Sequence, residues 1–84
     1  MREKFLRHLR KQIELQCSVF SWSLRIGVLT ERVAVERIGL LCGIIGTGFS
    51  LDMLEYEEFI AFRSFVDNLG NELAQEIQDL RRGG

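Results

Sequence analysis

Apolar residues recur at steps of three or four along most of this 84-residue chain, which is the spacing of one face of an α-helix. The longest series lies in the last third and consists of Phe59, Phe62, Val66, Leu69, Leu73, Ile77 and Leu80. Asp52 followed by Glu55 has the form of a capping box, which marks a helix start. The pattern predicts one long helix over residues 53–82. A cluster of weak helix formers around Gly70 leaves a break there as the alternative.

The beginning of the chain predicts a second long helix, over residues 2–26. Phe5, Leu9 and Ile13 open one apolar stripe, and Leu15 and Trp22 belong to another. Residues 19–28 also alternate between apolar and polar, which is typical of a strand. We favour the helix because the chain offers no clear partner strand, so the strand would have to pair with another molecule.

Between these two helices, a shorter one is expected over residues 31–45. Gly27 suits the left-handed residue that follows a helix, and Thr30 suits an N-cap. The glycines within residues 46–48 are expected to end the helix. Gly39 and Gly43 lie one turn apart, which predicts close approach of another helix because glycine otherwise weakens a helix interior.

The predicted fold class is therefore all-α, a three-helix bundle-like single domain. The chain contains no proline, which fits a few long helices better than many short turns. A chain of this length buries a modest fraction of its surface, and its apolar side chains exceed what three helices easily cover. We expect a homodimer whose interface is formed by Trp22 and by the apolar series of the last helix.

Charge divides the chain into two parts. Residues 1–37 hold eight Lys or Arg and four Glu, a net charge of +4, and residues 38–84 carry a net charge of −5. The basic patch consists of Arg2, Lys4, Arg7, Arg10 and Lys11. In an up-down-up bundle the first and third helices run parallel, so this patch is expected to lie near the acidic start of the third helix. That arrangement would fix the register of the helices.

The sequence offers no constellation for catalysis, a metal or a cofactor. His8 is the only histidine, and no serine has a base nearby. Gly43, Gly46 and Gly48 lack the lysine of a phosphate-binding loop. We expect no enzyme. Cys17 and Cys42 lie in apolar helical runs and are expected to be reduced, with a disulfide as the alternative.

The longest uncharged run, residues 38–51, is shorter than a membrane span, and no secretory signal is evident. We therefore expect a cytoplasmic protein. The leading functional hypothesis is a small protein–protein interaction module, an adaptor, inhibitor or assembly factor that acts as a homodimer. The alternative is a nucleic-acid-binding regulator that uses the basic patch. Binding of the first helix to a membrane is disfavoured by Glu3 and Glu14.

Overall fold

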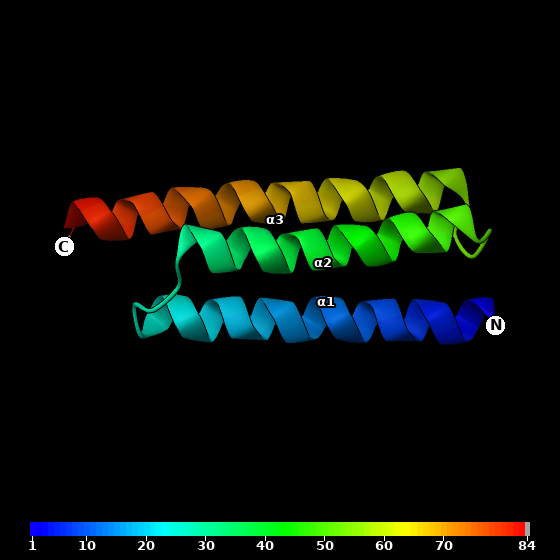
Figure 1. Ribbon diagram of the computed structural model, residues 1–84, viewed down its shortest axis with the longest axis horizontal. Helices are drawn as coiled ribbons and strands as arrows, with labels where there is room; N and C mark the ends of the chain where they lie inside the picture. Colours follow the sequence, from blue (N-terminus) through cyan, green and yellow to red (C-terminus); the bar gives the residue numbers. More distant parts are fainter. Residues whose placement is uncertain (84) are drawn as a thin grey trace.

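The computed structural model describes residues 1–83 and contains three α-helices: α1 (Arg2–Arg25), α2 (Glu31–Ser50) and α3 (Tyr56–Gly83). They run up, down and up in a bundle that measures 46 × 18 × 16 Å (Figure 1). The all-α prediction is confirmed, and the strand alternative is wrong because the chain is helical through Arg25. α3 continues through Gly70 without a break, as favoured. The largest interface joins α2 to α3, and the smallest joins α1 to α3.

The junction of α1 and α2 follows the sequence prediction. Gly27 has a φ of 75°, and the Val28 amide donates to the carbonyl oxygen of Ser23 at 3.0 Å, which closes a Schellman motif. The Thr30 hydroxyl oxygen accepts from the Val33 amide at 3.3 Å and so caps α2. Both expected turn residues therefore have their expected roles.

The junction of α2 and α3 differs from the prediction. α2 continues through the glycines of residues 46–48 to Ser50, so the expected end at residue 45 is wrong. Asp52 does not cap α3. It has a φ of 59° and completes a second Schellman motif, in which the Met53 amide donates to Gly48 at 2.8 Å. α3 begins three residues later than expected, and the Glu58 carboxylate accepts from the Glu55 amide at 3.0 Å.

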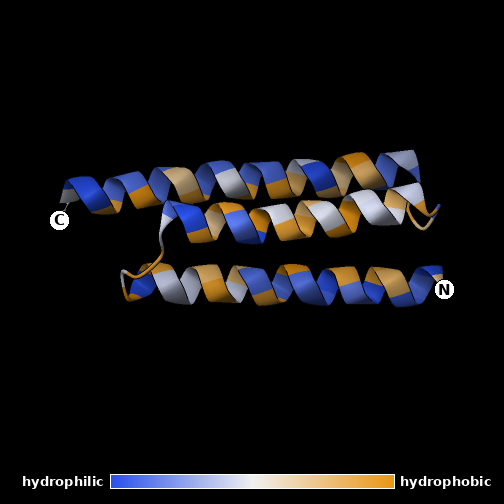
Figure 2. Cartoon of the chain, viewed as in Figure 1, coloured by the Kyte–Doolittle hydropathy of each residue, from blue (hydrophilic) through white to orange (hydrophobic). Residues whose placement is uncertain are grey.

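The core consists of two clusters along the bundle axis, and both include side chains from all three helices or their junctions. Figure 2 shows the apolar faces of the helices turned toward one another. The buried members of the first cluster are Leu9, Leu41, Ile45, Leu54 and Val66. Those of the second cluster are Phe20, Leu29, Ala34, Leu73 and Ile77. Leu54 and Leu29 come from the two junctions and close the clusters at opposite ends.

α1 is attached to α2 at two identifiable points besides the core. The Phe5 ring lies on Gly48, where a Cβ atom would overlap the ring. Near the middle, Arg37 donates to the amide oxygen of the buried Gln16 at 2.9 Å. Gly39 and Gly43 have no atom within 4 Å of the position a Cβ would take, so the close approach predicted for them does not occur within the chain. Gly48 is instead the glycine of α2 that the packing of α1 requires.

Candidate interaction surface

The structure divides the predicted interface residues into three groups. Val66, Leu73 and Ile77 are buried in the core of the single chain and are not accessible to a partner. Phe59, Phe62 and Leu69 are half-buried. Leu80 and Trp22 are exposed, with 46% and 59% of their surface accessible. Three of the eight predicted residues are therefore unavailable to a partner, while other large apolar side chains, such as Val35 and Phe65, are exposed.

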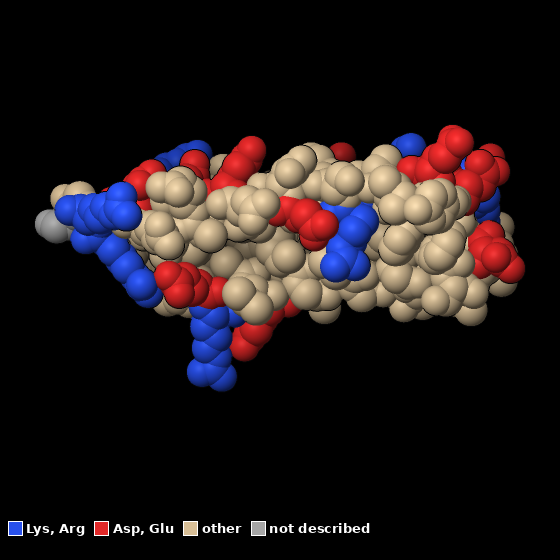
Figure 3. Space-filling model, turned by 90° about the horizontal axis from the view of Figure 1, so that it is seen from above, with Lys and Arg blue, Asp and Glu red and all other residues tan. Residues whose placement is uncertain are grey.

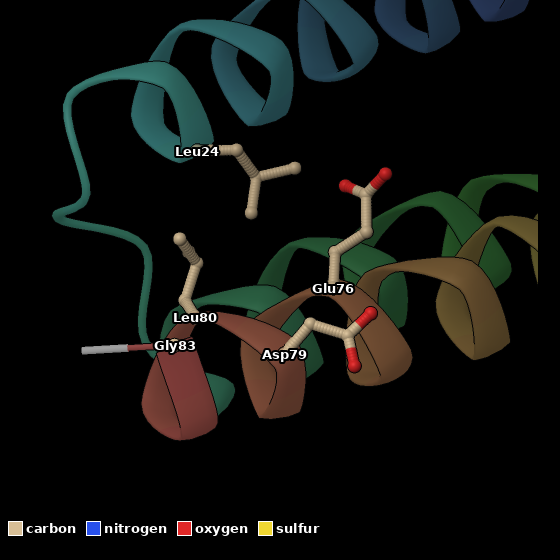
Figure 4. A pocket seen from close by; sticks show the side chains of 5 residues that line it. All are labelled: Leu24, Glu76, Asp79, Leu80 and Gly83. Atoms are coloured by element: carbon tan, nitrogen blue, oxygen red, sulfur yellow. The ribbon is translucent and has the colours of Figure 1, made fainter.

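One set of accessible apolar side chains lies in a groove between the parallel helices α1 and α3. At the end nearer the N-terminus, a hollow of about 240 Å³ is lined by Arg10, Ile13, Glu14, Phe62 and Phe65. At the other end, a hollow of about 460 Å³ is lined by Leu24, Glu76, Asp79, Leu80 and Gly83 (Figure 4). We call these two hollows and the surface between them the α1–α3 groove.

The groove exists because of how the helices are arranged. α2 is the partner of both other helices, while α1 and α3 share little surface along their length. Figure 4 shows Leu24 reaching from α1 and Leu80 from α3 into the space between the two helices. Phe65 remains 49% accessible at the other hollow. An aromatic side chain left this open in a small bundle is a candidate contact for a partner.

Trp22 does not belong to this groove. It precedes Leu24 by two residues, and such residues point to nearly opposite sides of a helix. The structure therefore separates Trp22 from Leu80, although both were predicted for one interface. A second group of accessible apolar residues lies on the Trp22 side of α1 and on α2, and it includes Leu15, Ile26 and Leu40.

The basic patch is neutralised at one of its five residues. Arg2 donates to the Glu58 carboxylate at 2.6 Å, which is the predicted meeting of the starts of α1 and α3. Arg7, Arg10 and Lys11 line a separate hollow along α1 together with Glu3 and Glu14. Within residues 1–83, these three cations and Lys4 form no ion pair. Most of the patch is therefore available to an external group.

The acidic end of the groove comes from the second half of α3. The Asp79 carboxylate accepts from the side-chain amide of Gln75 at 3.1 Å. Glu76 has no ion-pair partner among the residues that the structure describes. Figure 3 shows Lys and Arg side chains at the C-terminal end of the face seen from above, Asp and Glu side chains at its other end, and both kinds between them. α3 has Glu57 and Glu58 in its first turn and Arg81 and Arg82 in its last turn, so each end of the bundle carries both signs of charge.

A second groove lies between α2 and α3. Its lining includes Gly39, Cys42, Gly70 and Ala74, and the rim carries Arg63 and Asp67. Arg63 and Asp67 pair with each other at 3.3 Å, so the rim offers little charge to a partner.

The two cysteines are free thiols. Burial raises the pKa of the Cys17 thiol, so less of the reactive thiolate is present at neutral pH. Across residues 1–83, no group of three or more His, Cys, Asp or Glu side chains is placed to hold a metal ion.

α2 is long and apolar enough to cross a membrane by length and composition, with a mean hydropathy of 1.4. The structure buries 22% of that segment. The core helix of a soluble protein and a signal sequence pass the same test of length and composition, so this finding assigns no location. The cytoplasmic location stays a prediction.

Comparison of the chain with protein-family models, curated protein sequences and solved structures finds no match.

Proposed function

We propose that this protein is a small helical protein–protein interaction module, an adaptor, inhibitor or assembly factor, that acts as a homodimer through the α1–α3 groove. The observation that carries the proposal is the groove itself, in which Phe65 and Leu80 stay accessible between two helices that scarcely touch. Interface anchors are typically large side chains, most often aromatic, that lie inside a polar rim. The groove combines these features along most of the length of the molecule.

The test is the solution mass of the protein by light scattering. We expect about twice the 9.7 kDa of one chain for the natural sequence. The Phe65→Glu variant is expected to be a folded monomer, because a carboxylate would be buried without a partner at the interface. Ile60→Glu is the matched control, since Ile60 is on the same helix, is 42% accessible and lines neither hollow of the groove. It should leave the dimer intact.

A monomeric natural protein, or a dimer that Phe65→Glu leaves unchanged, would exclude the α1–α3 groove as a site of self-association. Helix content measured by circular dichroism should be the same for all three proteins, which separates dissociation from unfolding.

The alternative function is nucleic-acid binding, and the accessible cations at Arg7, Arg10 and Lys11 favour it. Contacts to phosphates release counterions, so binding of this kind weakens steeply as salt increases. A fluorescent DNA duplex and a single-stranded RNA, each titrated with protein at low and high salt, test this function. Binding that weakens with salt and is lost in an Arg7→Gln, Lys11→Gln variant would support it. Absence of binding at low salt would remove it.

A further inference from the structure

A group of accessible apolar side chains extends over α1 and α2. Leu15 and Trp22 are seven residues apart on α1, and Val33 and Leu40 are seven residues apart on α2, so each pair lies along one line of its helix. Between 36% and 62% of each residue in the group is accessible. We call the group the α1–α2 face, and it consists of Leu15, Trp22, Ile26, Val33, Leu40 and Leu51.

One hollow shows that the two lines lie on the same side of the bundle. It has a volume of about 510 Å³, and its lining includes His8 from α1 and Leu40 and Thr47 from α2. His8 is seven residues before Leu15, and Thr47 is seven residues after Leu40, so the hollow joins the two lines. Among residues 1–83, those of α3 contribute nothing to this lining. The α1–α2 face is therefore separate from the α1–α3 groove.

The α2 part of the face suits an apolar environment. α2 is the most apolar of the three helices, and residues 38–51 carry no charge, as the absence of strongly hydrophilic colour from this part of α2 in Figure 2 shows. The bundle buries only 22% of its most apolar segment. The exposed polar side chains of residues 38–51 are the hydroxyls of Thr47 and Ser50. Protein interfaces typically include many hydrogen bonds, whereas a lipid surface requires mainly apolar area and charge.

Cations lie along the outer edge of the face on α1. Lys11 precedes Leu15 by one turn, and Lys4 lies seven residues before Lys11 on the same line of the helix. Arg25 follows Trp22 by three residues, so the two side chains are neighbours on the helix surface. Within residues 1–83, Lys4, Lys11 and Arg25 are exposed and form no ion pair.

The acidic residues of α1 lie on its other side. Glu14 lines the hollow that α1 forms with α3, and Glu3 is eleven residues before it, on the same line of the helix. Lys11 lies between the two sides, since it also lines a hollow with Glu3 and Glu14. The objection that these two carboxylates raise to membrane binding therefore applies to the α3 side of α1. It does not apply to Leu15 and Trp22.

The acidic groups around the rest of the face are few. Glu36 on α2 pairs with Arg32 at 3.4 Å, so the two carry no net charge between them. Asp52 follows Leu51 at the end of α2 and forms no ion pair among residues 1–83. The further acidic residues at this end belong to the start of α3, where Glu58 pairs with Arg2. The three cations of α1 therefore outnumber the unpaired acids that border the face.

We propose that the α1–α2 face binds the surface of a membrane that contains anionic lipids, with both helices parallel to the bilayer plane. Trp22 and the five aliphatic side chains enter the boundary between headgroups and acyl chains, a region in which tryptophan is enriched. Lys4, Lys11 and Arg25 lie at the level of the lipid phosphates, and α3 faces the water. This inference goes beyond the proposed dimer and does not depend on it, because the α1–α3 groove is on another side of α1.

Trp22 is the only tryptophan of the chain, so its fluorescence reports directly on the face. Vesicles of phosphatidylcholine and phosphatidylserine in equal parts should shift its emission to shorter wavelength and protect it from quenching by iodide. Vesicles of phosphatidylcholine alone should bind more weakly. The double variant Lys4→Gln/Lys11→Gln should lose about tenfold or more in affinity for the mixed vesicles, since each cation near an anionic surface contributes about fivefold. Added salt should weaken the binding of the natural protein as well.

A matched pair of variants on α2 tests the apolar part of the face. Leu40→Glu should lower the affinity for the mixed vesicles about tenfold or more, because it places a carboxylate at the lipid boundary. Val35→Glu is the control, since Val35 is 70% accessible on the same helix but lines the α2–α3 groove. It should bind as the natural protein does. Circular dichroism without lipid should give the same helix content for both variants.

Unchanged Trp22 fluorescence with either kind of vesicle would overturn the proposal, and so would equal binding by Leu40→Glu and Val35→Glu. If Leu40→Glu lowers the solution mass in the absence of lipid, the face binds a second copy and the membrane assignment is wrong. The Phe65→Glu variant should show the Trp22 shift whether or not the natural protein is a dimer. Failure of the proposed dimer and failure of membrane binding are therefore observed separately.

Discussion

The two helix junctions adopt the same backbone conformation with different residues. Both Gly27 and Asp52 take the left-handed conformation that ends a helix in a Schellman motif. Glycine adopts this conformation without steric cost, whereas an L-residue is disfavoured there by about 1–2 kcal/mol, somewhat less for Asp. Asp52 therefore holds a position for which glycine is the better residue.

Replacement of these two residues should shift stability in opposite directions. Asp52→Gly is expected to raise the free energy of unfolding by up to about 1 kcal/mol, and Gly27→Ala to lower it by about the same amount. Urea denaturation followed by circular dichroism measures both, with Asp52→Ala as the control that removes the carboxylate but keeps the strain. A loss of stability in Asp52→Gly would mean that the Asp52 side chain stabilises the turn by more than its conformation costs.

At the residue scale, the sequence alone did not show which glycine of α2 contacts a neighbouring helix. Gly39, Gly43 and Gly48 look alike in the sequence, and spacing pointed to the first two as contact points. The structure places the Phe5 ring on Gly48 and leaves the other two open. The difference is set by which side of α2 faces α1, and that is a property of the packed bundle. The Phe5 contact also falls within the part of α2 that continues past the residue where the helix was expected to end.

At the scale of elements, the three helices were predictable because their apolar spacing is regular over many turns. The boundaries of the helices were harder to predict. The Asp52–Glu55 pattern and the Glu55–Glu58 pair both resemble a capping box, and only packing selects between them. The interfaces also differ in strength. α2 and α3 form an extensive hairpin, while α1 adds to it through part of the core, the Phe5–Gly48 contact and the Arg37–Gln16 hydrogen bond.

This difference predicts unequal protection of the helices. In native-state hydrogen exchange, amides in the middle of α2 and α3 should exchange more slowly than those in the middle of α1. The measurement is best made on the Phe65→Glu variant, in which no second copy would cover α1. Equal protection of all three helices would show that the bundle opens only as a whole.

At the scale of the whole molecule, the sequence identified apolar side chains but not the surface each one covers. Val66, Leu73 and Ile77 were assigned to a partner because three helices were expected to leave them uncovered, yet they fill the core of the chain. Phe65 and Leu80, on the same helix, remain accessible. Which of these side chains is inside depends on the rotation of α3 about its own axis, and a single helical stripe does not fix that angle.

The order in which the helices are connected bears on how the protein folds during synthesis. Within this chain α1 is made before both helices of the hairpin that it joins. At about 5–20 residues per second, residues 31–83 take on the order of 3–10 s to follow it. Until the hairpin is complete, Leu9 and Phe20 have no core to enter, and the five Lys and Arg residues in the first eleven positions favour solubility of the segment. The cations of the basic patch would therefore serve the emerging chain before the bundle has formed.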